Sequence, residues 1–178
     1  ITGELDEQNK SAALQAASGR FKGYGLALDT LQANLFTVQD SAGGNMWANN
    51  LHYETVQLGN LNLDLITKGD TTVSDLVLAN DSLSILRLGT RILPTDTGVF
   101  VYPDILQLFD TEYVTDRKNP LYIAKGNMSV DHFQISRDSM KISLDGDMNT
   151  FDASIKNADL TLLNYLLSSD TTIINNGQ

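Results

Sequence analysis

The sequence predicts an all-β protein, mainly an antiparallel meander, and three observations carry this prediction. Apolar and polar residues alternate along many short segments, as in strands that bury one face. Turn signals rich in Gly, Asn and Asp separate these segments at intervals of roughly ten residues. The chain as a whole is rich in Asn, Asp, Ser, Thr and Gly, which is typical of short strands joined by tight polar turns.

The N-terminal half contains the clearest alternation. Residues 61–65 read Leu-Asn-Leu-Asp-Leu, which places three leucines on one face, and a turn signal follows at Lys68-Gly69-Asp70. Residues 24–35 and 73–79 alternate in the same way. Between residues 83 and 88 the alternation slips by one position, which predicts a β-bulge. Residues 98–103 form a short predicted strand that Pro103 ends.

The alternation of apolar and polar residues resumes after Pro120. Four alternating segments follow, and the breaks between them fall at residues 125–127, 137–139 and 145–147. The last break, Asp145-Gly146-Asp147, lies between two alternating runs, and Asp-Gly in that position predicts a hairpin turn.

Three segments do not alternate. Residues 11–18 are rich in Ala, Leu and Gln, which are good helix formers. Residues 104–113 and 159–169 carry apolar residues at mixed spacing, with Asp104 or Asp159 as a possible N-cap. We expect one to three short helices or irregular caps in these segments.

A chain of 178 residues suits one domain or one slab of a longer repetitive protein. Because it opens on Ile1 without an initiator Met, we expect residues 1–178 to be a single fragment of such a protein. A weak internal echo relates residues 59–64 to residues 126–131, both reading Gly, Asn, apolar, polar, apolar, Asp. The echo indicates either a duplicated unit or a coincidence of common residue types.

Charge and composition limit the possible partners and binding sites of the protein. The net charge of −10 disfavours nucleic acid and anionic membrane surfaces as partners. With no cysteine, the chain has no disulfide, thiolate nucleophile or Cys-based zinc site. No apolar run approaches the roughly 18 residues that span a bilayer.

The sequence contains no recognisable reaction centre. His52 and His132 have no partner at a metal-ligand spacing, and strand alternation predicts that Asp131 points away from the His132 ring. No nucleophile elbow or phosphate-binding loop occurs. Trp47 and Tyr53, expected on one face, fit either a carbohydrate-stacking platform or the core. We therefore predict no catalytic residue, no metal, no cofactor and no enzymatic activity.

Amphipathic strands must hide their apolar faces, because exposing them would cost about 25 cal/mol per Å². A second sheet in a β-sandwich, a closed barrel, or one sheet curled around an apolar concave face would each do so. In the curled sheet, the side chains that point inward would form the surface that binds an apolar ligand. The candidates for this lining are Leu26, Leu28, Leu61, Leu63, Leu65, Leu76, Leu78, Leu83, Ile85, Val130, Met140, Ile142, Leu144, Phe151 and Ile155.

The strand pattern resembles the repeating units of the TamB and AsmA-like family of bacterial envelope proteins. Residues 140–178, "MKISLDGDMNTFDASIKNADLTLLNYLLSSDTTIINNGQ", carry the resemblance most clearly, with one strand, a second strand, "ADLTLLNYLL" and a spacer. Residues 18–40, which open with Gly19 and Gly23, are similar to another such unit. The resemblance covers residues 19–178.

This resemblance implies a half-pipe or taco-shaped sheet in the periplasm, within a protein tethered to the inner membrane of a Gram-negative bacterium. Its apolar concave face would shield phospholipid acyl chains during transport between the inner and outer membranes. An outer-membrane barrel of the Omp85 class is the protein partner that the family implies, with a role in outer-membrane protein assembly. The alternative is a structural or adhesive β-sandwich or solenoid module with a closed core.

Overall fold

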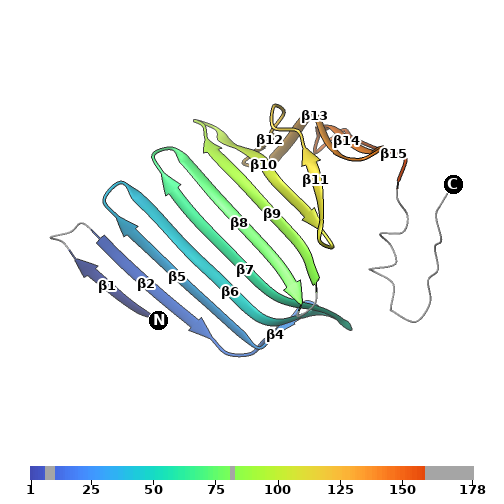
Figure 1. Ribbon diagram of the computed structural model, residues 1–178. Coiled ribbons are helices and arrows are strands. Elements are labelled where there is room, and N and C mark those ends of the chain that lie inside the picture. The colour runs from blue at the N-terminus through green and yellow to red at the C-terminus, as the bar shows by residue number, and fades with distance from the viewer. Residues whose placement is uncertain (7–10, 81–82, 159–178) are drawn as a thin grey trace.

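The computed structural model describes residues 1–6, 11–80 and 83–158, and these residues form one antiparallel sheet without a helix (Figure 1). The all-β prediction is confirmed. No helix long and apolar enough to cross a membrane occurs within these ranges. The fifteen strands are β1 (Thr2–Asp6), β2 (Ser11–Ser18), β3 (Phe21–Gly23), β4 (Leu26–Leu28), β5 (Thr30–Val38), β6 (Ser41–Tyr53), β7 (Val56–Lys68), β8 (Thr71–Asn80), β9 (Leu83–Pro94), β10 (Gly98–Leu108), β11 (Thr111–Thr115), β12 (Leu121–Ala124), β13 (Asn127–Arg137), β14 (Met140–Asp147) and β15 (Phe151–Lys156).

The sheet is a meander in which most neighbours in sequence are neighbours in space. Its order is β1-β2-β5-β6-β7-β8-β9-β10-β11-β13-β14-β15. Two short excursions leave this path: β3 pairs with β4, which pairs with β6, and β12 fills the space between β10 and β13. The predicted breaks after Lys68, Lys125 and Arg137 are hairpin turns. The strands on either side of the predicted break near Asn80 pair with each other.

Cross-strand register places the side chains on two chemically different faces, because directly opposed residues in an antiparallel pair lie on the same side. Leu63 is paired with Met46 on one side and with Leu76 on the other, and Leu76 is paired with Leu88. We call the side that carries Leu63 the aliphatic face and the opposite side the polar face.

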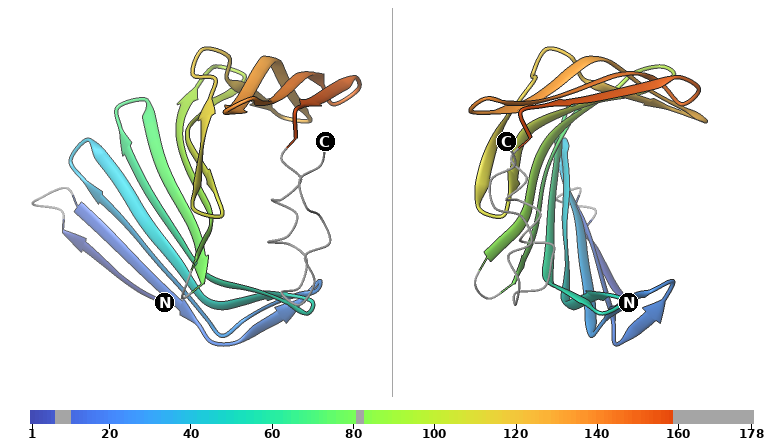
Figure 2. Two further views of the ribbon diagram at one scale, coloured as in Figure 1. Left: turned by 45° about the vertical axis from the view of Figure 1, so that its right-hand side comes forward. Right: turned by 90° about the vertical axis from the view of Figure 1, so that its right-hand side faces the viewer.

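The sheet is strongly curved. Figure 2 shows the strands coloured blue to teal bending near one end, while β13–β15 run across the other end of the sheet. Register shifts mark bulges in β6 after Ala48 and in β10 between Pro103 and Ile105, and bulges bend strands. At the bend in β6, Leu28, Ala48 and Leu51 pack into one buried cluster. Since residues on either side of the bend contact each other through this face, the aliphatic face lies inside the bend.

Burial confirms that the two faces differ. The buried hydrophobic side chains all belong to the aliphatic face, although no second sheet of described residues covers it. They are Leu28, Ala48, Leu51, Tyr113, Val130, Phe133 and Met140. Curvature crowds the side chains on the inner side of a single layer, which accounts for this burial.

The prediction of short helices is wrong for the two segments that the structure describes. Residues 11–18 form strand β2, which pairs along its length with β1 and β5. Residues 104–113 comprise the end of β10, the turn at residues 109–110 and the start of β11. Pairing with neighbours outweighs the modest helix propensity of Ala, Leu and Gln. The third segment, residues 159–169, lies outside the described residues.

Two predicted breaks also differ from the structure. Pro103 does not end its strand, because it lies beside the bulge of β10, and bulges are positions where a sheet accommodates proline. Asp145 and Gly146 lie within β14, and the turn follows them: the Asp147 carboxylate accepts hydrogen bonds from the backbone N–H groups of Asn149 and Thr150. The hairpin was predicted correctly, but its turn was placed too early.

Candidate functional site

The aliphatic face brings together the predicted lining residues. Except for Ile85, every one of them has the register of this face, from Leu26 on β4 to Ile155 on β15. Ile85 is the extra residue of a bulge between β8 and β9, where Leu78 pairs with Leu86 and Ala79 pairs with Ser84. The predicted slip between residues 83 and 88 is therefore a bulge. The binding role of these residues stays a prediction.

The face is wider than the sequence indicated. The register adds apolar side chains from β5, β6, β9, β10 and β13 that were not among the predicted lining residues. These are Leu31, Leu35, Met46, Leu86, Leu88, Leu106, Leu108, Phe133 and Ile135. The alternation had already placed Leu31, Leu35, Leu86 and Leu88 in strands, but it did not assign them to this face. One row of this face crosses six adjacent strands, β5 to β10, without a polar side chain. It consists of Ala33, Met46, Leu63, Leu76, Leu88 and Leu106.

Most polar side chains on the aliphatic face are small hydroxyls, and two pairs of them are hydrogen-bonded to each other. The Ser74 and Thr90 hydroxyls are 2.5 Å apart, and those of Thr67 and Thr72 are 2.8 Å apart. Arg137, at the end of β13, is the one charged side chain that the register of the described strands places on this face. An apolar ligand on the rows of aliphatic side chains would therefore meet few polar groups.

Charges collect on the polar face instead. Arg87 forms a two-pronged ion pair with Asp75 between β9 and β8, and Arg91 forms one with Asp104 between β9 and β10. The hydrogen bonds to these carboxylates raise the pKa of both arginines. Each pair joins neighbouring strands and, being partly exposed, contributes on the order of 1 kcal/mol or less.

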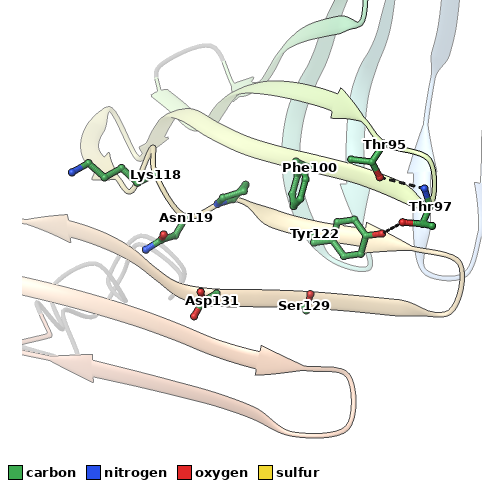
Figure 3. Close-up of a pocket in the computed structure, with 9 residues that line it drawn as sticks. Thr95, Thr97, Phe100, Lys118, Asn119, Tyr122, Ser129 and Asp131 are labelled. Atoms are coloured by element: carbon green, nitrogen blue, oxygen red, sulfur yellow. Dashed lines mark hydrogen bonds between the residues drawn. The ribbon is translucent and has the colours of Figure 1, made fainter.

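A hollow of about 680 Å³ opens on the polar face between β10, β12 and β13 (Figure 3). The rings of Phe100 and Tyr122 lie side by side in it, with centroids 5.1 Å apart. Hydrogen bonds within the protein occupy much of its polar lining: Tyr122 is bonded to Thr97, and Asn119 donates to Asp116. Because it lies on the opposite side of the sheet, this hollow is separate from the aliphatic face.

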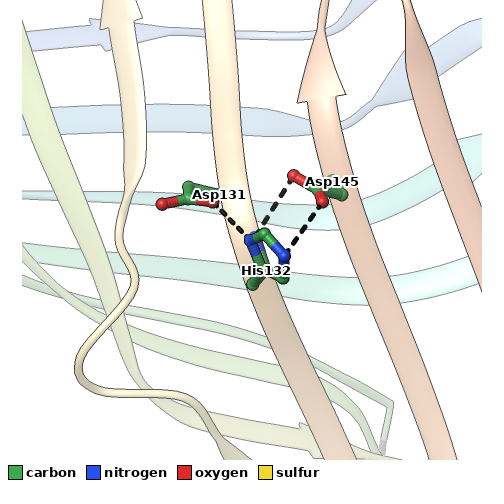
Figure 4. Close-up of side chains that lie close together, drawn as sticks. All are labelled: Asp131, His132 and Asp145. Carbon is green, nitrogen blue, oxygen red and sulfur yellow. Dashed lines mark hydrogen bonds and ion pairs between the residues drawn. The ribbon is translucent and has the colours of Figure 1, made fainter.

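His132 departs from the sequence prediction. It has a φ of 53° at the bulge in β13, a backbone conformation that breaks the alternation of side chains. The ring Nδ1 is therefore hydrogen-bonded to Asp131, and Nε2 lies 3.5 Å from the Asp145 carboxylate on β14 (Figure 4). The prediction that Asp131 points away from the His132 ring was wrong. Asp131 and His132 are exposed and Asp145 is half-buried, and their potential ligand atoms lie within 4.8 Å of one another.

These carboxylates make His132 pH-sensitive. The hydrogen bond to Asp131 and the charge of Asp145 raise the pKa of His132 above its ordinary value of 6.5. A raised pKa means that the folded state binds the proton more tightly, so the stabilisation is complete below pH 6.5 and is lost as the pH rises through the raised pKa. We expect His132→Gln to lower the melting temperature below pH 6.5 and to leave it unchanged well above the raised pKa.

An NMR titration of the His132 ring checks the cause. Asp145→Asn should lower its pKa towards the ordinary value, and Asp131→Asn should lower it further, since the Asp131 hydrogen bond is the largest contribution. A pKa that is the same in all three proteins would contradict this account.

Trp47 and Tyr53 do not form a platform. The bulge between Ala48 and Leu51 adds residues between them, so the register places Trp47 opposite Asn62 on the polar face and Tyr53 beside Leu26 on the other. Neither the carbohydrate-stacking arrangement nor a shared position in the core fits this geometry.

Comparisons of the chain with protein-family models, with curated proteins and with solved structures found no match.

Proposed function

We propose that this chain is a segment of a periplasmic, bridge-like protein that shields phospholipid acyl chains on its aliphatic face during transport between the inner and outer membranes. One observation carries the proposal: leucine, isoleucine and other apolar side chains cover the inner side of a curved single-layer sheet across most of its strands. Exposed apolar surface of this extent is typical of a binding surface.

The chemistry of the face suits a flexible hydrocarbon chain. Each methylene that leaves water for an apolar surface gains about 0.8 kcal/mol, so burying ten methylenes gains about 8 kcal/mol before the cost of ordering the chain. Rows of similar aliphatic side chains offer near-equal affinity at successive strands. Because no single position binds a lipid much more tightly than the next, the lipid can move from strand to strand while its head group stays in water.

The alternative of a closed-core structural or adhesive module receives less support. A closed core requires a second layer on the apolar side, and no other sheet of described residues packs there. The proposal assigns no reaction, metal or cofactor. Membership of the TamB and AsmA-like family, a tether in the inner membrane and an Omp85-class barrel partner are parts of the proposal that rest on the resemblance of the strand pattern alone.

Mass spectrometry of the purified chain tests the proposal. We expect phospholipid to co-purify from a bacterial host, and the delipidated protein to take up phosphatidylethanolamine from vesicles. The reason is that the aliphatic face has a lower free energy when lipid covers it than when water does. A protein that is purified free of lipid and stays free of lipid beside vesicles would favour the closed-core alternative.

A further inference from the structure

We propose that Arg137 and Tyr113 bind the phosphodiester group of a phospholipid whose acyl chains lie on the aliphatic face. This inference rests on the proposed function. It assigns a binding site to the phosphodiester group, for which the rows of apolar side chains offer no partner. Three features support it: the position of Arg137, the hydrogen bonds that its guanidinium lacks, and the buried hydroxyl of Tyr113.

Arg137 is placed where a head group would meet water. It is the last residue of β13, and it is paired with Met140, the first residue of β14. Along β13 the aliphatic face therefore runs from Val130 through Phe133 and Ile135 to a guanidinium at the end of the strand. A phospholipid has the same order, from acyl chains to an anionic phosphate.

The Arg137 guanidinium has spare donors. Its Nε lies 3.5 Å from the exposed carboxylate of Asp138, and it forms no hydrogen bond with any other described residue. Arg87 and Arg91, in contrast, each use two nitrogens to bind a carboxylate on the polar face. The Arg137 side chain is only 35 % exposed, so its unused donors are partly withdrawn from water. A planar guanidinium with free N–H groups suits two oxygens of a phosphate.

Tyr113 supplies a second donor beside it. This residue lies on β11 on the aliphatic face and is only 3 % exposed. Its hydroxyl is buried without a hydrogen-bond partner, which costs about 1–3 kcal/mol. The Arg137 guanidinium carbon lies 6.0 Å from the centre of the Tyr113 ring. One anion at this position would accept hydrogen bonds from both residues.

Charge complementarity favours a phosphodiester over a neutral lipid. The protein carries a net charge of −10, which repels anions in general, so an anionic group needs a local cation. Arg137 is that cation on the aliphatic face. The phosphodiester is common to phospholipids and absent from diacylglycerol, which separates recognition of the head group from recognition of the chains.

Calorimetry with soluble short-chain lipids tests the inference on the whole chain. Dihexanoylphosphatidylcholine carries both chains and phosphate, dihexanoylglycerol carries the chains alone, and inorganic phosphate carries the anion alone. We expect Arg137→Gln to weaken binding of the phosphatidylcholine about tenfold, the usual scale for losing a charged hydrogen-bond donor, and to leave dihexanoylglycerol binding unchanged. Tyr113→Phe should weaken phosphatidylcholine binding about threefold. The affinity of Arg137→Lys for this lipid should lie between those of Arg137→Gln and the wild type. Arg20→Gln, a change at an exposed arginine paired with Asp29, is the matched control and should change neither.

The outcomes separate the two proposals. Equal weakening of both lipids in Arg137→Gln, or weakening of neither, would overturn the phosphodiester site while leaving acyl-chain binding in place. Binding of inorganic phosphate as tight as that of the phosphatidylcholine would also overturn it. A wild-type protein that binds neither lipid would overturn the proposed function itself.

Discussion

Leu63→Asp is expected to remove most lipid from the protein while leaving the sheet folded. Leu63 lies in the middle of the aliphatic face, flanked by Met46 and Leu76, and is partly exposed. A carboxylate there stays hydrated in the lipid-free protein, but an acyl chain laid over it would strip that water away at a cost of several kcal/mol. We expect lipid retention to fall at least about tenfold, which corresponds to roughly 1.4 kcal/mol.

Asn60→Asp is the matched control for this substitution. Asn60 lies on the same strand but on the polar face, and its side-chain oxygen accepts a hydrogen bond from the Asn50 backbone, which a carboxylate also does. Ile142→Asp, on the same face of β14, should repeat the loss. Lipid content is measured by mass spectrometry, and folding by circular dichroism. If Leu63→Asp and Asn60→Asp retain equal amounts of lipid, the aliphatic face is not the binding surface.

Phe133→Ala is expected to destabilise the fold by about 3–5 kcal/mol, the usual cost of truncating a buried phenylalanine. The Phe133 side chain is only 2 % exposed, although it belongs to a single-layer sheet, because the curvature of the sheet crowds its inner side. Phe151, on the same face of β15, is 51 % exposed, so Phe151→Ala should cost less than about 1 kcal/mol.

Urea unfolding of the two variants measures this difference through the shift in midpoint at constant slope. The pair of substitutions removes the same atoms, so only the surroundings of the ring differ. Similar losses in the two variants would show that the inner side of the sheet does not bury Phe133 as the curvature implies.

The sequence predicted the strands well because alternation is a local property. The run from Leu61 to Leu65 needs no knowledge of its neighbours to be read as a strand with an apolar face. The bulge near Ile85 was also readable, since one extra residue in a strand shifts the apolar positions by one from that point on. Residues 11–18 show the limit: their helix propensity is weak, and pairing with β1 and β5 decides their structure.

Features that depend on register could not be predicted. Whether Leu63 lies beside Met46 is set by the bulges and turns between them, and a shift of one residue would move every side chain to the other face. The same uncertainty misplaced Tyr53 relative to Trp47, because a bulge separates them. His132 is a third case, since its positive φ brings it to Asp131 against the expected alternation. The sequence therefore predicts which strands carry apolar faces, and only the register shows that these faces join.

The central claim is that acyl chains lie on one face of the sheet, and a photocrosslinking scan along β7 tests it most directly. A photoreactive benzoylphenylalanine is placed in turn at positions 60 to 65, and lipid adducts are measured by mass spectrometry after illumination in the presence of phospholipid. We predict adducts at 61, 63 and 65, on the aliphatic face, and none at 60, 62 and 64, on the polar face. Adducts of equal yield at all six positions, or at the even positions alone, would contradict the account.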